Sequence, residues 1–155
     1  MAETIAPERT ELLPPTYWFG CALLMITIHV FFPLVQWSEP LLTYAGVTLI
    51  AAAGLSGGWA AWTFRQYGTS VHPFEPPRCL VTAGPYRYSR NPMYLSLLVM
   101  LIGLWLILGS VTPVVVVMVF ETILSTRFIE PEERMLENCY GDAFRRYKAA
   151  VRQWI

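Results

Sequence analysis

A short segment between two apolar stretches, residues 84–94, combines side chains that suit ligand binding. It holds two arginines, three tyrosines and two prolines, in the order Gly84-Pro85-Tyr86-Arg87-Tyr88-Ser89-Arg90-Asn91-Pro92-Met93-Tyr94. Lipid cannot hydrogen-bond irregular backbone, so at membrane depth such a segment must be buried in protein or line a polar cavity. Ionisable groups at a membrane boundary are costly unless they are paired, which makes them functional candidates. The segment therefore predicts a ligand pocket at the rim of a bilayer.

A second polar group lies closer to the C-terminus and consists of Arg127, Glu130, Glu132, Glu133 and Tyr147. Glu132 and Glu133 precede Leu136 by four and three positions, so both head the apolar stripe of an amphipathic helix. We expect these two carboxylates to face the interior and not bulk water. Two simpler readings stay open: the helix lies on the lipid headgroups, or the charged side chains only extend to them.

The composition points to the membrane. Of 155 residues, 55% are hydrophobic and 14% are charged, against about a quarter charged in typical soluble domains. The net charge of zero argues against nucleic acid as a partner. Three scattered cysteines and two histidines suggest neither a disulfide framework nor a metal site.

The elements that must position the polar groups are four apolar segments, each close to the roughly 20 residues that cross a bilayer as a helix. They run over about 17–36, 41–64, 92–108 and 111–128. We expect an all-α integral membrane protein: a single domain over 1–155 with four transmembrane helices, an irregular cytoplasmic linker over 65–91 and a C-terminal amphipathic helix over 131–154. In the second segment, Gly54 and Gly58 predict a small-residue face for close helix contact.

The distribution of charge predicts the topology. All eleven Lys and Arg lie before the first segment, between residues 65 and 90, or from Arg127 onward. Four crossings put these regions on one face, which is the cytoplasmic one because positive charge is retained inside. We therefore expect a multi-pass protein with both termini in the cytoplasm, and no signal peptide in the acidic residues 1–16. Glu121, inside the fourth segment, either pairs with Arg90 or Arg127 or reaches the pocket.

Two motifs resemble one family. Arg90-Asn91-Pro92-Met93-Tyr94 is similar to the Arg-His-Pro-x-Tyr motif of the isoprenylcysteine carboxyl methyltransferase and phospholipid methyltransferase superfamily, and residues 80–86, with Gly68-Thr69 and Pro73 upstream, resemble its lead-in. The tail Glu132-Glu133-Arg134-Met135-Leu136, then Tyr140-Gly141 and Tyr147, resembles the family ending. The likeness runs from about residue 65 to the C-terminus. Three departures stand out: Asn91 replaces the histidine, Phe144 replaces a tyrosine, and Arg152-Gln153 replaces Pro-Arg.

This resemblance implies a membrane methyltransferase that uses S-adenosyl-L-methionine and takes its lipidic or amphiphilic acceptor from the bilayer. By position, the cofactor-binding residues would be Gly84, Pro85, Tyr86, Arg90, Asn91, Pro92, Tyr94, Glu133 and Tyr147, and the catalytic residues Arg127 and Glu132. Arg90 would pair with the cofactor's carboxylate, and tyrosine faces would hold its sulfonium by cation–π attraction.

The acceptor stays open among three classes. An isoprenylcysteine-like carboxylate needs no base and would be steered by Arg127. A phospholipid amine or a small thiol is normally protonated, so Glu132 or Glu133, with a pKa raised by burial, would remove a proton. Two further hypotheses remain: a non-enzymatic transporter subunit that uses Glu121, and a related fold that binds cofactor or lipid without turnover.

Overall fold

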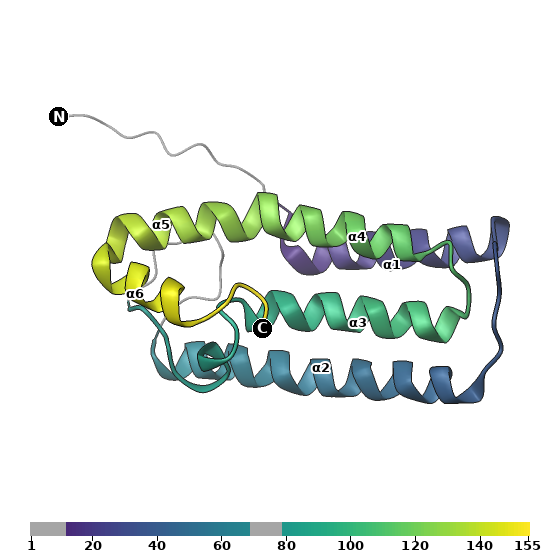
Figure 1. Ribbon diagram of the computed structural model, residues 1–155, viewed down its shortest axis with the longest axis horizontal. Coiled ribbons are helices and arrows are strands. Elements are labelled where there is room, and N and C mark those ends of the chain that lie inside the picture. Colours follow the sequence, from purple (N-terminus) through teal and green to yellow (C-terminus); the bar gives the residue numbers. More distant parts are fainter. Residues whose placement is uncertain (1–11, 69–78) are drawn as a thin grey trace.

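The computed structural model describes residues 12–68 and 79–155, which are helical apart from short connections (Figure 1). The α-helices are α1 (Pro14–Phe31), α2 (Pro40–Gln66), α3 (Pro92–Leu108), α4 (Val114–Ile123), α5 (Glu130–Tyr140) and α6 (Asp142–Ala150). A 3₁₀ turn, η1 (Gly84–Arg87), precedes α3, and a π-helical stretch, η2 (Leu124–Ile129), joins α4 to α5. The predicted all-helical class is confirmed. Predictions that concern residues 1–11 and 69–78 lie outside the described residues.

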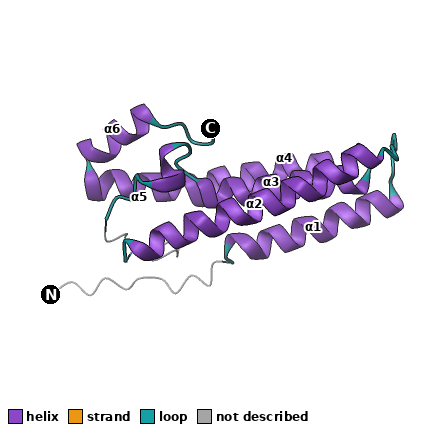
Figure 2. Ribbon diagram, turned by 90° about the horizontal axis from the view of Figure 1, so that it is seen from below, coloured by secondary structure: helices purple, strands orange, loops and turns teal. Residues whose placement is uncertain are grey.

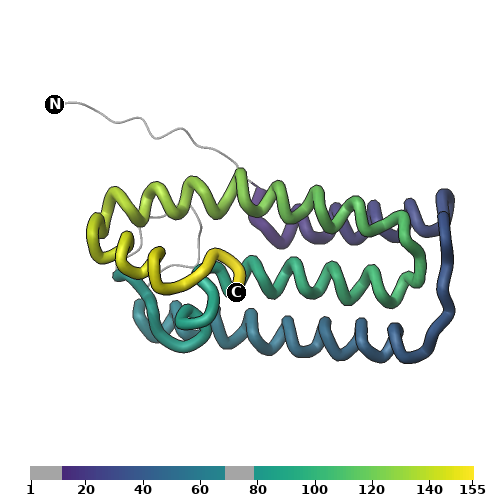
Figure 3. The backbone as a smooth tube through the Cα atoms, viewed as in Figure 1, coloured from purple at the N-terminus to yellow at the C-terminus, as the bar shows by residue number. Residues whose placement is uncertain are grey.

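Helices α1 to α4 run side by side along the long axis, with α3 in the middle (Figures 1 and 2). The main core is formed where α1, α3 and α4 meet, around Met25, Leu101, Phe120 and Leu124. The tube in Figure 3 shows that the connections α1–α2 and α3–α4 close one end of this bundle, while α5 and α6 lie at the other. The C-terminus returns to the start of α3. This second end contains the polar groups singled out in the sequence.

Helix α2 packs with its small residues inward and its large ones outward. Its buried residues are Gly46, Ala53, Ala60 and Thr63, whereas Leu41 and Leu55 are each 77% exposed. A Cβ on Gly46 would lie 2.5 Å from the carbonyl oxygen of Gly103, so α2 and α3 approach backbone to backbone. The prediction of close small-residue contact was right in kind but wrong in its residues. Gly54 and Gly58 are exposed, and a Cβ on either would meet nothing within 4 Å.

Two of the described helices, α1 and α2, are long and apolar enough to cross a bilayer. α3 begins and ends where the sequence predicted, but it has only 17 residues. The regular α-helical part of α4 has only 10 residues, because the π-helical stretch η2 follows it directly. Four membrane-spanning helices were expected. Two of the described helices meet the criteria of length and composition.

The C-terminal region differs from the prediction. The helix that begins at Val114 continues through η2 into α5, so no new helix starts after Pro131. Pro131 has no N–H, and its ring would clash with the carbonyl of Arg127 in a regular α-helix; the wider π-helical stretch just before it avoids this conflict. The single helix predicted over 131–154 is wrong. It breaks at Gly141, whose φ of 50° is accessible to glycine, and again at the extended Val151.

Candidate functional site

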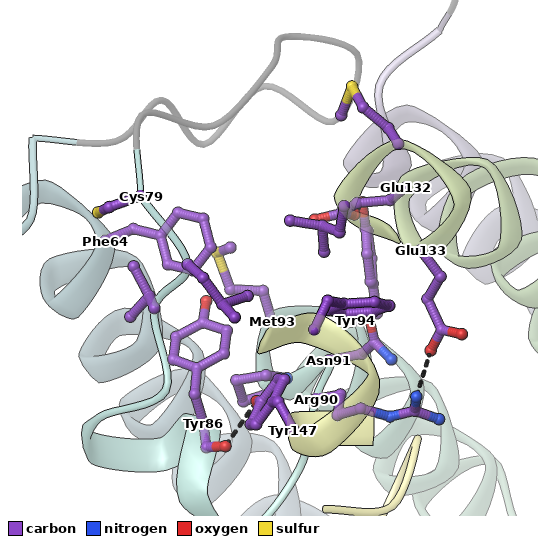
Figure 4. Close-up of a pocket in the computed structure, with 16 residues that line it drawn as sticks. Phe64, Cys79, Tyr86, Arg90, Asn91, Met93, Tyr94, Glu132, Glu133 and Tyr147 are labelled. Atoms are coloured by element: carbon purple, nitrogen blue, oxygen red, sulfur yellow. Dashed lines mark hydrogen bonds and ion pairs between the residues drawn. The ribbon is translucent and has the colours of Figure 1, made fainter. Parts of the chain in front are cut away.

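A pocket lies at the polar end of the bundle, between the end of α2, the segment before α3, and helices α5 and α6 (Figure 4). It is lined by Phe64, Cys79, Leu80, Val81, Tyr86, Arg90, Asn91, Pro92, Met93, Tyr94, Glu132, Glu133, Met135, Leu136, Phe144 and Tyr147. The space between the walls is about 720 Å³ when the open mouth and its solvent are included. The free core of the pocket is narrow, about 50 Å³, so a large ligand requires side chains at the mouth to move.

The 3₁₀ turn η1 delivers Tyr86 to the pocket. Gly84 starts it with a φ of 59°, and a Cβ there would lie 3.2 Å from the hydroxyl of Thr63 on α2. Pro85 is buried behind the wall, and the ring of Tyr86 packs on Phe64 at 4.8 Å between centroids. The Tyr86 hydroxyl is buried and has no hydrogen-bond partner within the described part of the chain. Gly84 and Pro85 therefore shape the wall without lining it.

Three charged residues form a chain of ion pairs beside the pocket. Arg90 Nη1 lies 3.0 Å from Glu133 Oε1, and Lys148 Nζ lies 2.7 Å from Glu133 Oε2. The side chains of Arg90 and Glu133 are 10% and 14% exposed, whereas that of Lys148 is 44% exposed. The N–H groups of Arg90 are not aligned on the carboxylate, so neither its Nε nor its Nη1 makes a hydrogen bond to a described residue. Arg90 thus keeps buried donors for a ligand.

Glu132 faces a different environment from Glu133. Its Oε2 accepts a hydrogen bond of 3.0 Å from the Tyr94 hydroxyl. Loss of solvent around the carboxyl raises the pKa of Glu132 to about 7; the hydrogen bond from Tyr94 lowers it, and the nearby charge of Glu133 raises it further. Glu132 therefore exchanges a proton near neutral pH, which suits a general base or acid.

Tyr147 connects α6 to the opposite wall. Its hydroxyl donates a 2.6 Å hydrogen bond to the carbonyl oxygen of Tyr86 (Figure 4). Burial raises the pKa of Tyr147 to about 12, although the charge of Arg90 opposes this rise. The phenol therefore stays protonated and serves as a hydrogen-bond donor. Phe144, one turn earlier, is almost fully buried and fixes α6 against the pocket.

The structure brings together most of the residues predicted for the site, since Tyr86, Arg90, Asn91, Pro92, Tyr94, Glu132, Glu133 and Tyr147 all line the pocket. Arg127 does not join them: it is exposed on η2 and lies outside the lining. Arg87, Tyr88 and Glu130 are exposed as well. Glu121 accepts a hydrogen bond of 2.8 Å from Ser125 and lines a separate groove between α3 and α4.

Several contributors were missed in the sequence. Lys148 pairs with Glu133, which lies fifteen residues earlier in the sequence. A separation of this length is not a helical spacing, so the sequence did not indicate the pair. Met93, Leu136 and Phe144 were noted in the sequence only as part of the family motifs or of the apolar stripe and were not predicted as site residues, yet they line the pocket. The Tyr140-Gly141 step was noted only as part of the resemblance, although a glycine inside a helical pattern also signals a break. That break is what turns α6 back onto the pocket.

Comparisons with known proteins place the chain in a family. A family model described as "Phospholipid methyltransferase" matches residues 41–143, about two thirds of the chain. The match takes in α2, which the resemblance noted in the sequence had left out. An uncharacterized protein of Haemophilus influenzae is 41% identical over 63 residues, which cover 41% of this chain and 100% of that protein. No solved structure matches significantly.

Proposed function

Because this chain belongs to the phospholipid methyltransferase family, we propose that it uses S-adenosylmethionine to methylate the amine of a membrane lipid. Membership makes the chain a membrane-associated methyltransferase and confirms the superfamily inferred from the two motifs. It also counts against a transporter subunit built around Glu121. The cofactor, the acceptor and the roles of individual residues are the content of the proposal.

The residues of the pocket fit the cofactor. Buried donors without partners, Arg90 Nε and the Tyr86 hydroxyl, suit the cofactor's carboxylate and other polar groups. Aromatic and apolar side chains, among them Phe64 and Phe144, suit its adenine ring. When bound, the cofactor supplies a methyl group on a positively charged sulfur, which departs as a neutral thioether. The ring of Tyr94 would stabilise that positive charge before transfer.

The charges around the pocket favour an amine over a carboxylate acceptor. Of the two cations beside it, Arg90 is assigned to the cofactor's carboxylate, and Lys148 is already paired with Glu133. Arg127, which would steer a carboxylate, is exposed elsewhere. Glu132, in contrast, is a proton acceptor inside the pocket with a pKa of about 7. This carboxyl is the single observation that carries the choice of acceptor.

Glu132 has one task in this reaction. Its carboxylate takes a proton from the ammonium group of the acceptor, which leaves the nitrogen lone pair free to bond to the methyl carbon. Tyr94 holds the carboxyl in place through its hydrogen bond. The walls of α5 and α6 exclude water, and alignment of donor and acceptor supplies most of the acceleration. Asn91 cannot gain or lose a proton as a histidine can, but the proposed mechanism assigns the proton transfer to Glu132. The replacement of the family histidine by Asn91 therefore does not argue against turnover.

We place the bundle α1–α4 across the bilayer, with the pocket at the cytoplasmic headgroup level. Large apolar side chains are exposed around the outside of the bundle, for example Phe19, Leu55 and Met118. The described basic residues gather on the side of α5 and α6, which favours that end as cytoplasmic. α3 and α4 are shorter than a typical membrane-spanning helix. Their lengths suit a bundle in which α3, the middle helix, is shielded from lipid by its neighbours. The acceptor amine would then reach the pocket from the side.

The cofactor part is tested by calorimetry with S-adenosylhomocysteine on detergent-purified protein. We expect the wild type to bind and Arg90→Ala to bind at least tenfold more weakly, because a charge-assisted hydrogen bond is worth about 1.5–3 kcal/mol. Arg87→Ala serves as the matched control, since Arg87 is exposed three residues earlier. Absence of binding by the wild type would refute the proposal.

The acceptor part is tested with radiolabelled methyl donor and reconstituted vesicles. One set contains phosphatidylethanolamine in a phosphatidylcholine background, one contains phosphatidylglycerol instead, and one contains a prenylated cysteine. We expect label only in the lipid of the first set. Label in the prenylcysteine alone would restore the carboxylate acceptor and remove the proposed role of Glu132.

A further inference from the structure

The last five residues, 151–155, which we call the C-terminal strap, follow α6 outside any helix and run beside the segment that starts α3. The backbone N–H of Arg90 donates to the carbonyl of Arg152 at 3.0 Å. The next carbonyl, that of Gln153, accepts two hydrogen bonds, from the Ser89 hydroxyl at 3.2 Å and from Asn91 Nδ2 at 3.1 Å. Three consecutive residues of the segment before α3, of which Arg90 and Asn91 line the pocket, are thus bonded to two consecutive residues of the strap.

The side chain of Gln153 points to a different element. Its Nε2 donates to Ser125 Oγ at 3.3 Å, and that hydroxyl donates to Glu121 Oε1 at 2.8 Å. Ser125 lies in η2, the π-helical stretch that leads into α5 and therefore into Glu132 and Glu133. Gln153 consequently connects the two walls of the pocket, one through its carbonyl and one through its amide.

The strap has its own anchor and does not touch the pocket. Trp154 packs against the main hydrophobic core, whereas Ile155 is 75% exposed. None of residues 151–155 is among the pocket-lining residues. Any influence of Gln153 on a bound ligand must therefore pass through the residues that it holds.

We propose that Gln153 is a positioning residue for the cofactor pocket, which fixes Arg90 and Asn91 on one wall against η2 and α5 on the other. This inference rests on the proposed function, because it concerns the same pocket. It assigns one N–H of the Asn91 amide a structural use, in the hydrogen bond to the Gln153 carbonyl, and leaves the second N–H and Oδ1 for a ligand. The bond from the Arg90 N–H to the strap fixes the backbone of the residue whose side chain lies against Glu133.

The test compares Gln153→Glu, Ser125→Ala and their double variant with wild type, with Ile155→Ala as the control at the exposed end of the strap. Gln153→Glu keeps the size of the side chain but cannot donate to Ser125. We expect each single variant to raise the dissociation constant for S-adenosylhomocysteine about fivefold, which corresponds to the loss of one hydrogen bond. The double variant should be no weaker than the singles, because both remove the same bond.

Two further readouts separate positioning from general stability. The melting temperature of the ligand-free variants should fall by no more than the loss of one hydrogen bond explains, and the kcat at saturating cofactor should stay near wild type while the KM for cofactor rises. Hydrogen exchange at the Arg90 amide should be faster in Gln153→Glu than in Ile155→Ala. Binding equal to wild type in both single variants would overturn the inference and leave the proposed function standing. A wild type that does not bind would overturn both.

Discussion

The two ends of the bundle differ in how completely their buried polar groups are hydrogen-bonded. At the end formed by the connections, Ser110 is fully buried; its hydroxyl shares a 2.8 Å hydrogen bond with His29, and its carbonyl accepts from the Trp105 indole at 2.9 Å. There the indole of Trp37 is the unsatisfied buried group among the described residues. At the other end, buried atoms of Tyr86, Arg90 and Glu133 lack hydrogen bonds, and two of these residues are charged.

This difference indicates where a ligand is expected. Leaving a buried polar group unpaired costs about 1–3 kcal/mol, and more for a charged group. Among the described residues, one buried polar group is open at the end formed by the connections and several converging ones are open at the other end, where a bound ligand would supply the missing partners. Ser110 is bonded within the fold, whereas Glu132 lines the pocket and is, in our proposal, available for chemistry.

The largest expected effect concerns the proton acceptor. Glu132→Gln keeps the shape of the side chain and a hydrogen-bond acceptor for Tyr94, but it removes the base. We expect methyl transfer to fall by roughly 10²–10⁴-fold, the usual contribution of general-base catalysis, with retained binding of S-adenosylhomocysteine. Glu130→Gln is the matched control, since Glu130 is exposed two residues earlier and pairs with Arg134 on its own helix. Equal activities of the two variants would remove Glu132 from the mechanism.

The next effect is on stability and separates the two cations that hold Glu133. Arg90→Met leaves a carboxylate that is only 14% exposed with one partner, so we expect a loss of about 3 kcal/mol in the free energy of unfolding. Lys148→Met should cost less than about 1 kcal/mol, because Lys148 is 44% exposed and its pair is screened by solvent. Denaturant titration in detergent measures both. A larger loss for Lys148→Met would contradict the ranking of the two pairs.

The third effect concerns pH and has a definite sign. Glu132 must be ionised to accept a proton, so kcat/KM should rise with pH through about 7. The hydrogen bond from Tyr94 lowers the pKa of Glu132, so Tyr94→Phe should move this rise to higher pH. Tyr88→Phe, at a 73% exposed position, should leave the profile in place.

The same group links stability to pH in the opposite direction. The folded pKa of Glu132 lies above its ordinary value of 4.5, so the folded state binds this proton more tightly than the unfolded state. The stabilisation is complete below about 4.5 and is lost as the pH rises through about 7. Melting temperatures of the ligand-free wild type should therefore fall across this interval, and those of Glu132→Gln should fall less.

The smallest effect tests the opposite end. Ser110→Ala removes the partner of His29 but keeps the backbone carbonyl that Trp105 uses. We expect a loss of about 1 kcal/mol in stability, the typical net value of one hydrogen bond, and methyl transfer at the wild-type level. A drop in activity without a drop in stability would show that the two ends are coupled.

Several features were determined by the sequence alone. The bounds of α3 follow from Pro92, which suits the first turn of a helix, and from Gly109, which takes a positive φ just after its end. The apolar composition predicted a helical membrane protein, and two motifs located eight of the pocket residues. These inferences succeed because helix starts, helix stops and motif residues are local properties, which neighbours in the chain decide.

The tertiary structure decided the rest. Gly46 and Gly57 contact α3 where Gly54 and Gly58 were expected to, because the face that a helix presents depends on its rotation against a neighbour. Arg127 stays outside the pocket, and the tail folds back at Gly141 so that Lys148 reaches Glu133 and Gln153 reaches Asn91. Each of these contacts either joins residues that are far apart in sequence or depends on which face a helix turns toward its neighbour. No local pattern records such contacts, because their free energy comes from surfaces that meet only after the chain has folded.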